Sequence, residues 1–154
     1  MAVLSEEQTM LRDMAREWTT NESPVTAFRK FRDLAPACGY DANAFKTMAE
    51  MGWAGIVIPE KFGGSDFGWL SLGLVLEETA KTLTASPLAS SALAASALVL
   101  GGSDGAKAAW LPKLASGEVV GTLAIDEGPR HNPAAIATTA TKAGDSWTLN
   151  GTKA

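Results

Sequence analysis

The pattern of apolar residues changes once along the chain, at Gly117. Before that residue, apolar side chains recur three and four positions apart, which is the spacing of amphipathic helices. After it, residues 119–125 and 136–141 are rich in β-branched side chains, which favours strands. The sequence therefore predicts a mainly α fold, with a helical domain over residues 1–117 and the beginning of a β domain over residues 118–154.

Local signals predict where the helices begin and end. Ser5 and Gln8 have the spacing of a capping box. Pro24 suits the first position of a second helix, because its missing amide would be unpaired there. Asp41 is a candidate N-cap for a third helix, which Gly52 would end. Three further helices are expected over residues 69–83, over 87–100, and from Asp104 to Gly117 with an interruption at Pro112.

The fifth of these helices carries Ala, Leu and Ser on every side. A helix that is apolar all round is normally surrounded by protein. Its apolar stretch, residues 88–100, is shorter than the roughly 20 residues needed to span a bilayer. We therefore expect a buried helix and no membrane association.

The last residues suggest a hairpin. Residues 147–149 alternate in polarity, and Asn150-Gly151 is typical of a type I′ turn. The return strand would begin at Thr152, and the sequence ends at Ala154. Because an unpaired strand leaves an open edge, we expect a truncated chain or a piece of a longer protein.

Composition narrows the function classes. The net charge of −4 contains no block of like charges, which argues against nucleic-acid binding. A single cysteine, Cys38, allows no internal disulfide and favours the cytoplasm. The N-terminus lacks the basic and then apolar layout of a signal peptide. The single histidine, His131, leaves no metal-ligand set, and a lone loop histidine is expected to be solvated and idle.

Few residues suggest catalysis directly. Glu77 and Glu78 are adjacent on a predicted helix, so their side chains point about 100° apart. We expect one of them to be solvated and the other to form a salt bridge, rather than an acid/base pair. Ser90, Ser91 and Ser96 have no basic neighbour, so a nucleophilic serine has no support.

Five short motifs occur in a fixed order. Residues 52–64 contain a G-hydrophobic-x-x-P-E-x-x-G-G loop, and residues 76–80 contain a Glu-Glu pair on a helix. Residues 111–118 read L-P-x-x-A-x-G-E. Residues 124–127 begin a segment of the type A-L-T-E-P-G-A-G-S-D, and residues 147–153 read x-x-L-N-G-x-K. In this order the motifs resemble the acyl-CoA dehydrogenase family over nearly the whole chain.

The resemblance implies an N-terminal orthogonal bundle of about six helices, followed by the first strands of an incomplete middle β-barrel. It also implies an FAD-dependent dehydrogenase that desaturates an acyl-CoA thioester between its α and β carbons. The family's catalytic glutamate belongs to a C-terminal domain, so no catalytic residue falls on this chain and the fragment itself is expected to be inactive. Electron-transfer flavoprotein or a similar acceptor, and a homo- or hetero-oligomer, are the partners implied.

The same resemblance assigns candidate binding residues. The family's first flavin-contacting strand matches Leu123, Ala124, Ile125, Asp126 and Glu127. The family's serine near the FAD pyrophosphate and the CoA phosphate falls on Asn132. Arg130 is expected to bind a substrate phosphate together with Asn132, since guanidinium pairs well with phosphate. Predicted helices 69–83 and 87–100 correspond to walls of the acyl pocket. Their small residues leave room for an acyl chain or allow close helix packing: Ala89, Ala92, Ala94 and Ala95.

The sequence departs from the family at these positions. Asp126 replaces a threonine, and its carboxylate would be repelled by flavin O2, would accept from flavin N3–H, or would point away. Pro129 and Pro133 remove two amide donors from a loop that is glycine-rich in the family. Two alternatives therefore remain beside the dehydrogenase: a non-catalytic subunit of a heteromeric acyl-CoA dehydrogenase, or a flavin monooxygenase of the same fold.

Overall fold

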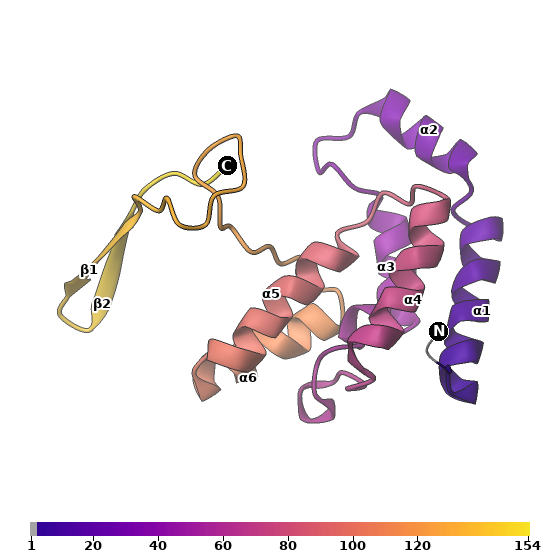
Figure 1. Cartoon of the computed structure of the whole chain (residues 1–154), viewed down its shortest axis with the longest axis horizontal. Coiled ribbons are helices and arrows are strands. Elements are labelled where there is room, and N and C mark those ends of the chain that lie inside the picture. The colour runs from indigo at the N-terminus through magenta and orange to yellow at the C-terminus, as the bar shows by residue number, and fades with distance from the viewer. Residues whose placement is uncertain (1–2) are drawn as a thin grey trace. The chain divides into compact units, whose positions relative to one another are not determined.

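The computed structural model describes residues 3–154 (Figure 1). The chain divides into two compact units, one ending at Thr122 and the other spanning Leu123–Ala154, and each is described by itself. The described residues contain six α-helices and two strands, which confirms the mainly α class with about six helices. The helices are α1 (Glu6–Asn21), α2 (Val25–Leu34), α3 (Ala42–Glu50), α4 (Gly68–Lys81), α5 (Leu88–Gly101) and α6 (Asp104–Ala115). Two short 3-10 helices, η1 (Trp53–Gly55) and η2 (Glu60–Phe62), lie between α3 and α4.

The predicted helix starts agree closely with the structure. Ser5 and Gln8 form a complete capping box before α1, with both hydrogen bonds 3.1 Å long. The Asp41 carboxylate accepts from the amides of Asn43 and Ala44 and caps α3. Pro24 is the N-cap of α2, one residue before the position predicted for it.

Helix α6 runs without a break from Asp104 to Ala115, so the predicted interruption at Pro112 is wrong. Proline removes one amide donor from a helix interior, at a cost of about 3 kcal/mol. Leu111, Leu114 and Ala115 are buried around it. Their burial offsets the lost hydrogen bond, and at the end of the helix the Ser116 amide donates to the Pro112 carbonyl.

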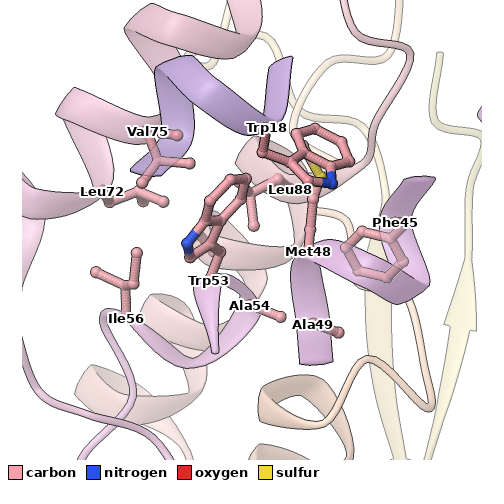
Figure 2. Packing of buried hydrophobic residues seen from close by; sticks show 12 residues of the cluster. Trp18, Phe45, Met48, Ala49, Trp53, Ala54, Ile56, Leu72, Val75 and Leu88 are labelled. Carbon is pink, nitrogen blue, oxygen red and sulfur yellow. The ribbon is translucent and has the colours of Figure 1, made fainter. Parts of the chain in front are cut away.

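The core of the first unit is built around two tryptophans from different elements (Figure 2). Trp18 of α1 and Trp53 of η1 meet edge to face, with ring centroids 5.4 Å apart. Further apolar side chains from α3, α4 and α5 fill the space around them: Phe45, Met48, Leu72, Val75 and Leu88. Since Trp53 is 1% exposed, η1 is the centre of this core.

Helix α5 buries only one stripe of residues, packed towards η1 and α6. Residues 88, 91, 92 and 95 are buried, whereas Leu93 is 49% exposed and Leu100 is 87% exposed. The prediction that protein surrounds this helix is therefore wrong for the part of the chain described. Within residues 3–154, no helix has both the length and the apolar character needed to cross a membrane.

The second unit contains a two-stranded antiparallel hairpin, β1 (Thr139–Ala143) and β2 (Ser146–Asn150). Ala143 pairs with Ser146, so the turn is Gly144-Asp145, and the prediction of a turn at Asn150-Gly151 is wrong. Gly144 has a φ of 62°, and a type II′ turn places glycine at this position. Asn150 instead closes the far end of the ladder opposite Thr139.

Residues 119–125 were expected to form a strand, and they form none. Contacts with two helices hold the beginning of this segment instead. The Gly121 amide donates to Ser91 Oγ at 3.2 Å, and the Val119 amide donates to the Lys113 carbonyl at 3.3 Å. A Cβ atom at Gly121 would lie 2.6 Å from Ala94 Cβ, so only glycine permits this close approach.

Candidate functional site

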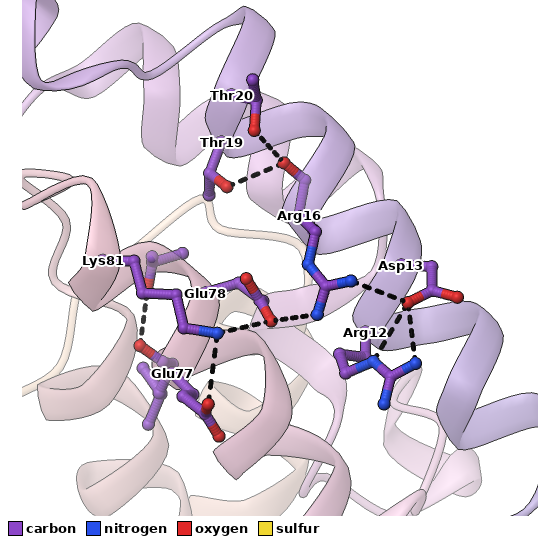
Figure 3. A network of polar contacts seen from close by, with 10 residues as sticks. Arg12, Asp13, Arg16, Thr19, Thr20, Glu77, Glu78 and Lys81 are labelled. Atoms are coloured by element: carbon purple, nitrogen blue, oxygen red, sulfur yellow. Dashed lines mark hydrogen bonds and ion pairs between the residues drawn. The ribbon is translucent and has the colours of Figure 1, made fainter.

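The Glu-Glu pair of α4 forms a structural ion-pair network in the first unit (Figure 3). Glu78 is 3% exposed, and its Oε1 accepts from Arg16 of α1 at 3.1 Å and from Lys81 at 2.9 Å. Burial raises the pKa of Glu78, but the hydrogen bonds from Lys81 and Arg16 outweigh it and hold the pKa below its ordinary value. Glu78 is therefore an ionised group that ties α1 to α4.

Glu77 lies at the solvated edge of that network: it is 67% exposed, and Lys81 Nζ is 3.2 Å from its carboxylate (Figure 3). One carboxylate is thus buried in a salt bridge and its neighbour is solvated, which confirms the prediction for this pair. The buried Glu78, paired with two cations, is not free to act as a proton-abstracting base.

A cleft of about 370 Å3 lies between the end of α4 and the start of α5. Its lining is mainly apolar and includes Leu76, Ala80, Leu83, Leu88 and Ala89. Of the small α5 residues, only Ala89 faces this cleft. Ala92 and Ala95 are 3% and 0% exposed inside the core. Close packing therefore explains those two alanines, and room for a ligand remains as an explanation for Ala89.

The α5 serines have structural roles. The hydroxyls of Ser90 and Ser96 donate to backbone carbonyls one turn earlier, and Ser91 Oγ accepts from the Gly121 amide.

In the second unit, Asp126 organises the loop that follows it. Asp126 Oδ1 accepts from the Asn132 amide at 2.9 Å, and Oδ2 lies 3.0 Å from His131 Nδ1. The hydrogen bond with His131, followed by the one from the Asn132 amide, lowers the pKa of Asp126. His131 is 71% exposed but is not idle, which corrects half of the prediction for it.

Glu127 forms hydrogen bonds with different partners from those of Asp126. Its carboxylate accepts from the amides of Ala137 and Thr138 at 2.6 and 2.9 Å, from the Thr138 hydroxyl, and from Lys153 Nζ at 2.9 Å. The Thr138 hydroxyl, the Ala137 amide and Lys153 lower the pKa of Glu127 to about 2. The Glu127 side chain is only 13% exposed.

The other candidate residues divide into two groups. Arg130 and Asn132 line a cleft of about 370 Å3 together with Glu127. The side chains of Leu123, Ala124 and Ile125 are exposed and do not line it. The structure therefore brings Glu127, Arg130 and Asn132 together around one cleft, and leaves the three apolar residues outside it.

Arg130 and Asn132 are the two residues of this cleft lining whose side chains could donate to a phosphate. The ion pairs within residues 123–154 join His131 to Asp126 and Lys153 to Glu127, and neither involves Arg130. Its guanidinium therefore has no carboxylate partner in this unit. Both nearby carboxylates already have cationic or amide partners, which weakens the repulsion that the sequence suggested between Asp126 and an electron-rich ligand. Within residues 3–154 there is no group of three or more metal-ligating side chains.

Comparison with known proteins identifies the family. The family model described as acyl-CoA dehydrogenase, N-terminal domain, matches residues 5–118. The chain belongs to the acyl-CoA dehydrogenase family.

Individual relatives agree with this assignment. The chain is 36% identical over 155 residues to (2S)-methylsuccinyl-CoA dehydrogenase of Cereibacter sphaeroides, covering 97% of this chain and 27% of the relative. It is 34% identical over 156 residues to glutaryl-CoA dehydrogenase of Desulfococcus multivorans, covering 97% of this chain and 39% of that protein. Among solved structures, a variant of the Tcur3481-Tcur3483 steroid ACAD superposes with a TM-score of 0.87 at 30% identity. That match covers 97% of this chain and 40% of the other.

The first of the family motifs in this acyl-CoA dehydrogenase chain forms a tight loop around η1. The amides of Ser65 and Asp66 donate to the carbonyls of Gly55 and Ile58, which folds the end of the motif back onto its beginning. A Cβ atom at Gly64 would lie 2.0 Å from the Ile58 carbonyl oxygen. Gly64 is therefore required by close backbone packing, whereas Gly63 has a φ of 83°, which favours glycine.

Sequence reasoning missed three partners of the Asp126 and Glu127 carboxylates. Thr138 and Lys153 bind Glu127, and His131 binds Asp126. Lys153 belongs to the last of the five motifs, so its presence was visible but its partner was not. Nothing local marks Thr138, which lies 11 positions from Glu127.

Proposed function

We propose that this chain is the N-terminal part of an FAD-dependent acyl-CoA dehydrogenase that desaturates an acyl-CoA thioester between its α and β carbons. The observation that carries the proposal is the match of residues 5–118 to the family's N-terminal domain, with 36% identity to a dehydrogenase of a CoA thioester. The chain spans 27% and 39% of the two curated relatives described above. Reaction, substrate and partners of the whole protein are therefore part of the proposal.

Each unit contributes a different kind of surface to this reaction. FAD, when bound, accepts the hydride from the β carbon. Arg130 and Asn132 would bind phosphate, Arg130 through its charged guanidinium and Asn132 through its side-chain amide N–H. The apolar cleft beside α4 and α5 would accommodate part of the acyl chain and exclude water from it.

The residue that removes the α proton is assigned to another part of the protein. Of the two α4 carboxylates, Glu78 is committed to Arg16 and Lys81, and Glu77 is solvated. Asp126 and Glu127 are held in their ionised forms by their own donors. We therefore expect residues 1–154 alone to show no dehydrogenase activity.

The test is optical. The complete protein is purified, and its visible absorbance is recorded before and after addition of a panel of acyl-CoA thioesters. The proposal predicts a yellow protein with flavin absorbance that one or more thioesters bleach. A colourless protein that does not take up added FAD would contradict it.

A second candidate is a subunit that shares its flavin or catalytic duties with a different partner chain. Two observations favour it. A similar solved structure carries the names of two proteins, Tcur3481 and Tcur3483. The loop after Asp126 also contains Pro129 and Pro133, which provide no amide for a phosphate. Co-expression with candidate partner chains, and measurement of FAD per polypeptide, distinguishes the two. One FAD per chain in a homo-oligomer supports the first candidate, and FAD only in a mixed complex supports the second.

An electron acceptor is required in either case, because reduced FAD has to be reoxidised. We propose electron-transfer flavoprotein or a similar redox protein in this role. Reoxidation of the bleached protein by purified electron-transfer flavoprotein, with excess acyl-CoA present, tests it.

A further inference from the structure

The second unit has no apolar core of its own. None of residues 123–154 is buried, and all ten residues of β1 and β2 are exposed. A two-stranded hairpin by itself is marginal in water. Within residues 123–154, polar contacts rather than apolar burial therefore join the hairpin to residues 123–127.

The Glu127 side chain supplies most of that connection, beside a hydrogen bond from the Ala154 amide to the Asp126 carbonyl at 2.9 Å. Its carboxylate binds residues 137 and 138, which precede β1, and also binds Lys153, which follows β2. The Lys153 ammonium makes a second contact, donating to the Ile125 carbonyl at 3.1 Å. Three segments of the unit thus meet at one carboxylate, and none of these donors is part of the hairpin ladder.

The position of Glu127 in the sequence connects this anchor to the cleft. Asp126, its immediate neighbour, holds the following loop through His131 and the Asn132 amide. The two carboxylates share one backbone segment, so fixing Glu127 also fixes where Asp126 directs the loop that carries Arg130. Hydrogen bonds to an ionised carboxylate are about twice as strong as neutral ones, which suits such an anchor.

We propose that Glu127 is a positioning residue for FAD binding. Its carboxylate fixes the segment before the cleft against both ends of the hairpin, and thereby places Arg130 and Asn132 for the phosphates. The assignment rests on the proposed function, because it takes FAD to be the ligand of this cleft. In this role Glu127 acts through the loop that carries Arg130 and Asn132.

The experiment compares FAD affinity of the complete protein and two variants, measured by flavin fluorescence during titration of the apoprotein. In Glu127→Gln the amide retains one acceptor oxygen but places an N–H group against a backbone amide. In Lys153→Met only the cationic donor is lost. We expect the Kd for FAD to rise about tenfold in Glu127→Gln, which corresponds to the loss of one charge-assisted hydrogen bond. The rise in Lys153→Met should be smaller.

Two controls separate positioning from general stability. Glu118→Gln removes an exposed carboxylate whose contact with Lys113 is 3.6 Å long, and it should leave FAD affinity unchanged. Val75→Ala destabilises the core of the first unit, far along the sequence from the cleft, and at a temperature where it remains folded it should also leave FAD affinity unchanged. The amide proton shifts of Ala137 and Thr138 provide a readout without flavin, and Glu127→Gln should move both.

The outcomes are distinct. If the unaltered protein binds no FAD, the proposed function fails, and with it the role of Glu127 towards FAD. If the unaltered protein binds FAD and Glu127→Gln binds it equally well, the positioning role alone is wrong. Equal weakening by Val75→Ala and Glu127→Gln would also overturn it, because the effect would then follow stability.

Discussion

The two units of this chain are held together by different physical means. In the first unit, side chains such as Trp53, Met48 and Leu72 are at most 1% exposed, and they form one continuous apolar cluster. In the second unit, no side chain between Leu123 and Ala154 is buried, and most of the hydrogen bonds that join the hairpin ends to residues 125–127 are accepted by the Glu127 carboxylate. Removal of apolar area from water stabilises one unit, and charge-assisted hydrogen bonds stabilise the other.

This difference determines which kind of change should destabilise each unit. Apolar burial is insensitive to protonation, whereas a carboxylate anchor loses its charge in acid. The first unit contains a carboxylate as well, Glu78, but there it supplements a core that exists without it. Core substitutions should therefore act on the first unit, and pH should act first on the second.

The largest expected effect comes from truncation of the central aromatic residue. Trp53→Ala should lower the free energy of unfolding of the first unit by about 3–5 kcal/mol, because it removes a 1% exposed ring and leaves a cavity. Chemical denaturation followed by circular dichroism measures it. Trp69→Ala, at a 54% exposed tryptophan, is the matched control and should change the value by less than about 0.5 kcal/mol. Equal effects of the two would contradict the core assignment.

Glu78→Gln should cost about 1–3 kcal/mol at neutral pH, since it removes the acceptor charge for Arg16 and Lys81. The Glu77→Gln variant should change stability by less than about 0.5 kcal/mol, because that side chain is solvated. The folded-state pKa of Glu78 is lowered, so its contribution is present above pH 4.5, its ordinary pKa, and is lost as pH falls. The gap between the unaltered protein and Glu78→Gln should therefore narrow in acid. A gap that stays constant with pH would rule out the charge as its cause.

Acid should release the second unit from its anchor. Glu127 has a pKa of about 2 in the folded state against 4.5 ordinarily, so between these values the released form binds more protons than the anchored one. Stability from this group is complete above pH 4.5 and is lost as pH falls towards 2. The amide proton shifts of Ala137 and Thr138 should move towards random-coil values over this range, while those of Met48 and Val75 remain. The same shifts in Glu127→Gln should already be altered at neutral pH.

The smallest expected effect concerns the corner after α4. Leu83 has a φ of 58°, and the amides of Leu83 and Thr84 donate to the carbonyls of Ala80 and Thr79, which is a Schellman ending with leucine in the place that glycine prefers. Leu83→Gly should stabilise the first unit by up to about 1 kcal/mol through relief of this left-handed strain. Leu93→Gly, at a similarly exposed leucine in the interior of α5, should instead cost about 1 kcal/mol. A thermal unfolding scan of both variants shows whether each substitution raises or lowers the stability of the first unit.

The sequence predicted the first unit better than the second, and the reason is physical. Helix caps such as Ser5 and Asp41 are decided by residues within four positions, so their signals are local. Pro112 was misjudged because burial of Leu111 and Leu114, a tertiary effect, outweighed a local rule. The α5 stripe was also missed, because an Ala-Leu-Ser helix looks alike on all sides until its neighbours are known.

In the second unit the decisive contacts join distant positions. Two glycine-containing pairs could have formed the hairpin turn. Gly144-Asp145 forms it, and Asn150 pairs with Thr139 at the far end of the ladder. The resemblance to a family identified seven candidate residues, which are residues 123–127, Arg130 and Asn132. Three of the seven line one cleft: Glu127, Arg130 and Asn132. The resemblance did not reveal that Glu127 binds Lys153, since these residues are 26 positions apart.

One ionised carboxylate, that of Glu127, anchors the second unit. This anchoring role is tested most directly by following the side-chain carboxyl 13C shift of Glu127 in an NMR titration from pH 7 downwards. The structure predicts a titration midpoint of about 2, well below the ordinary value of 4.5. A midpoint near 4.5 would show that Glu127 is free in solution, and would contradict the account of how this unit is held together.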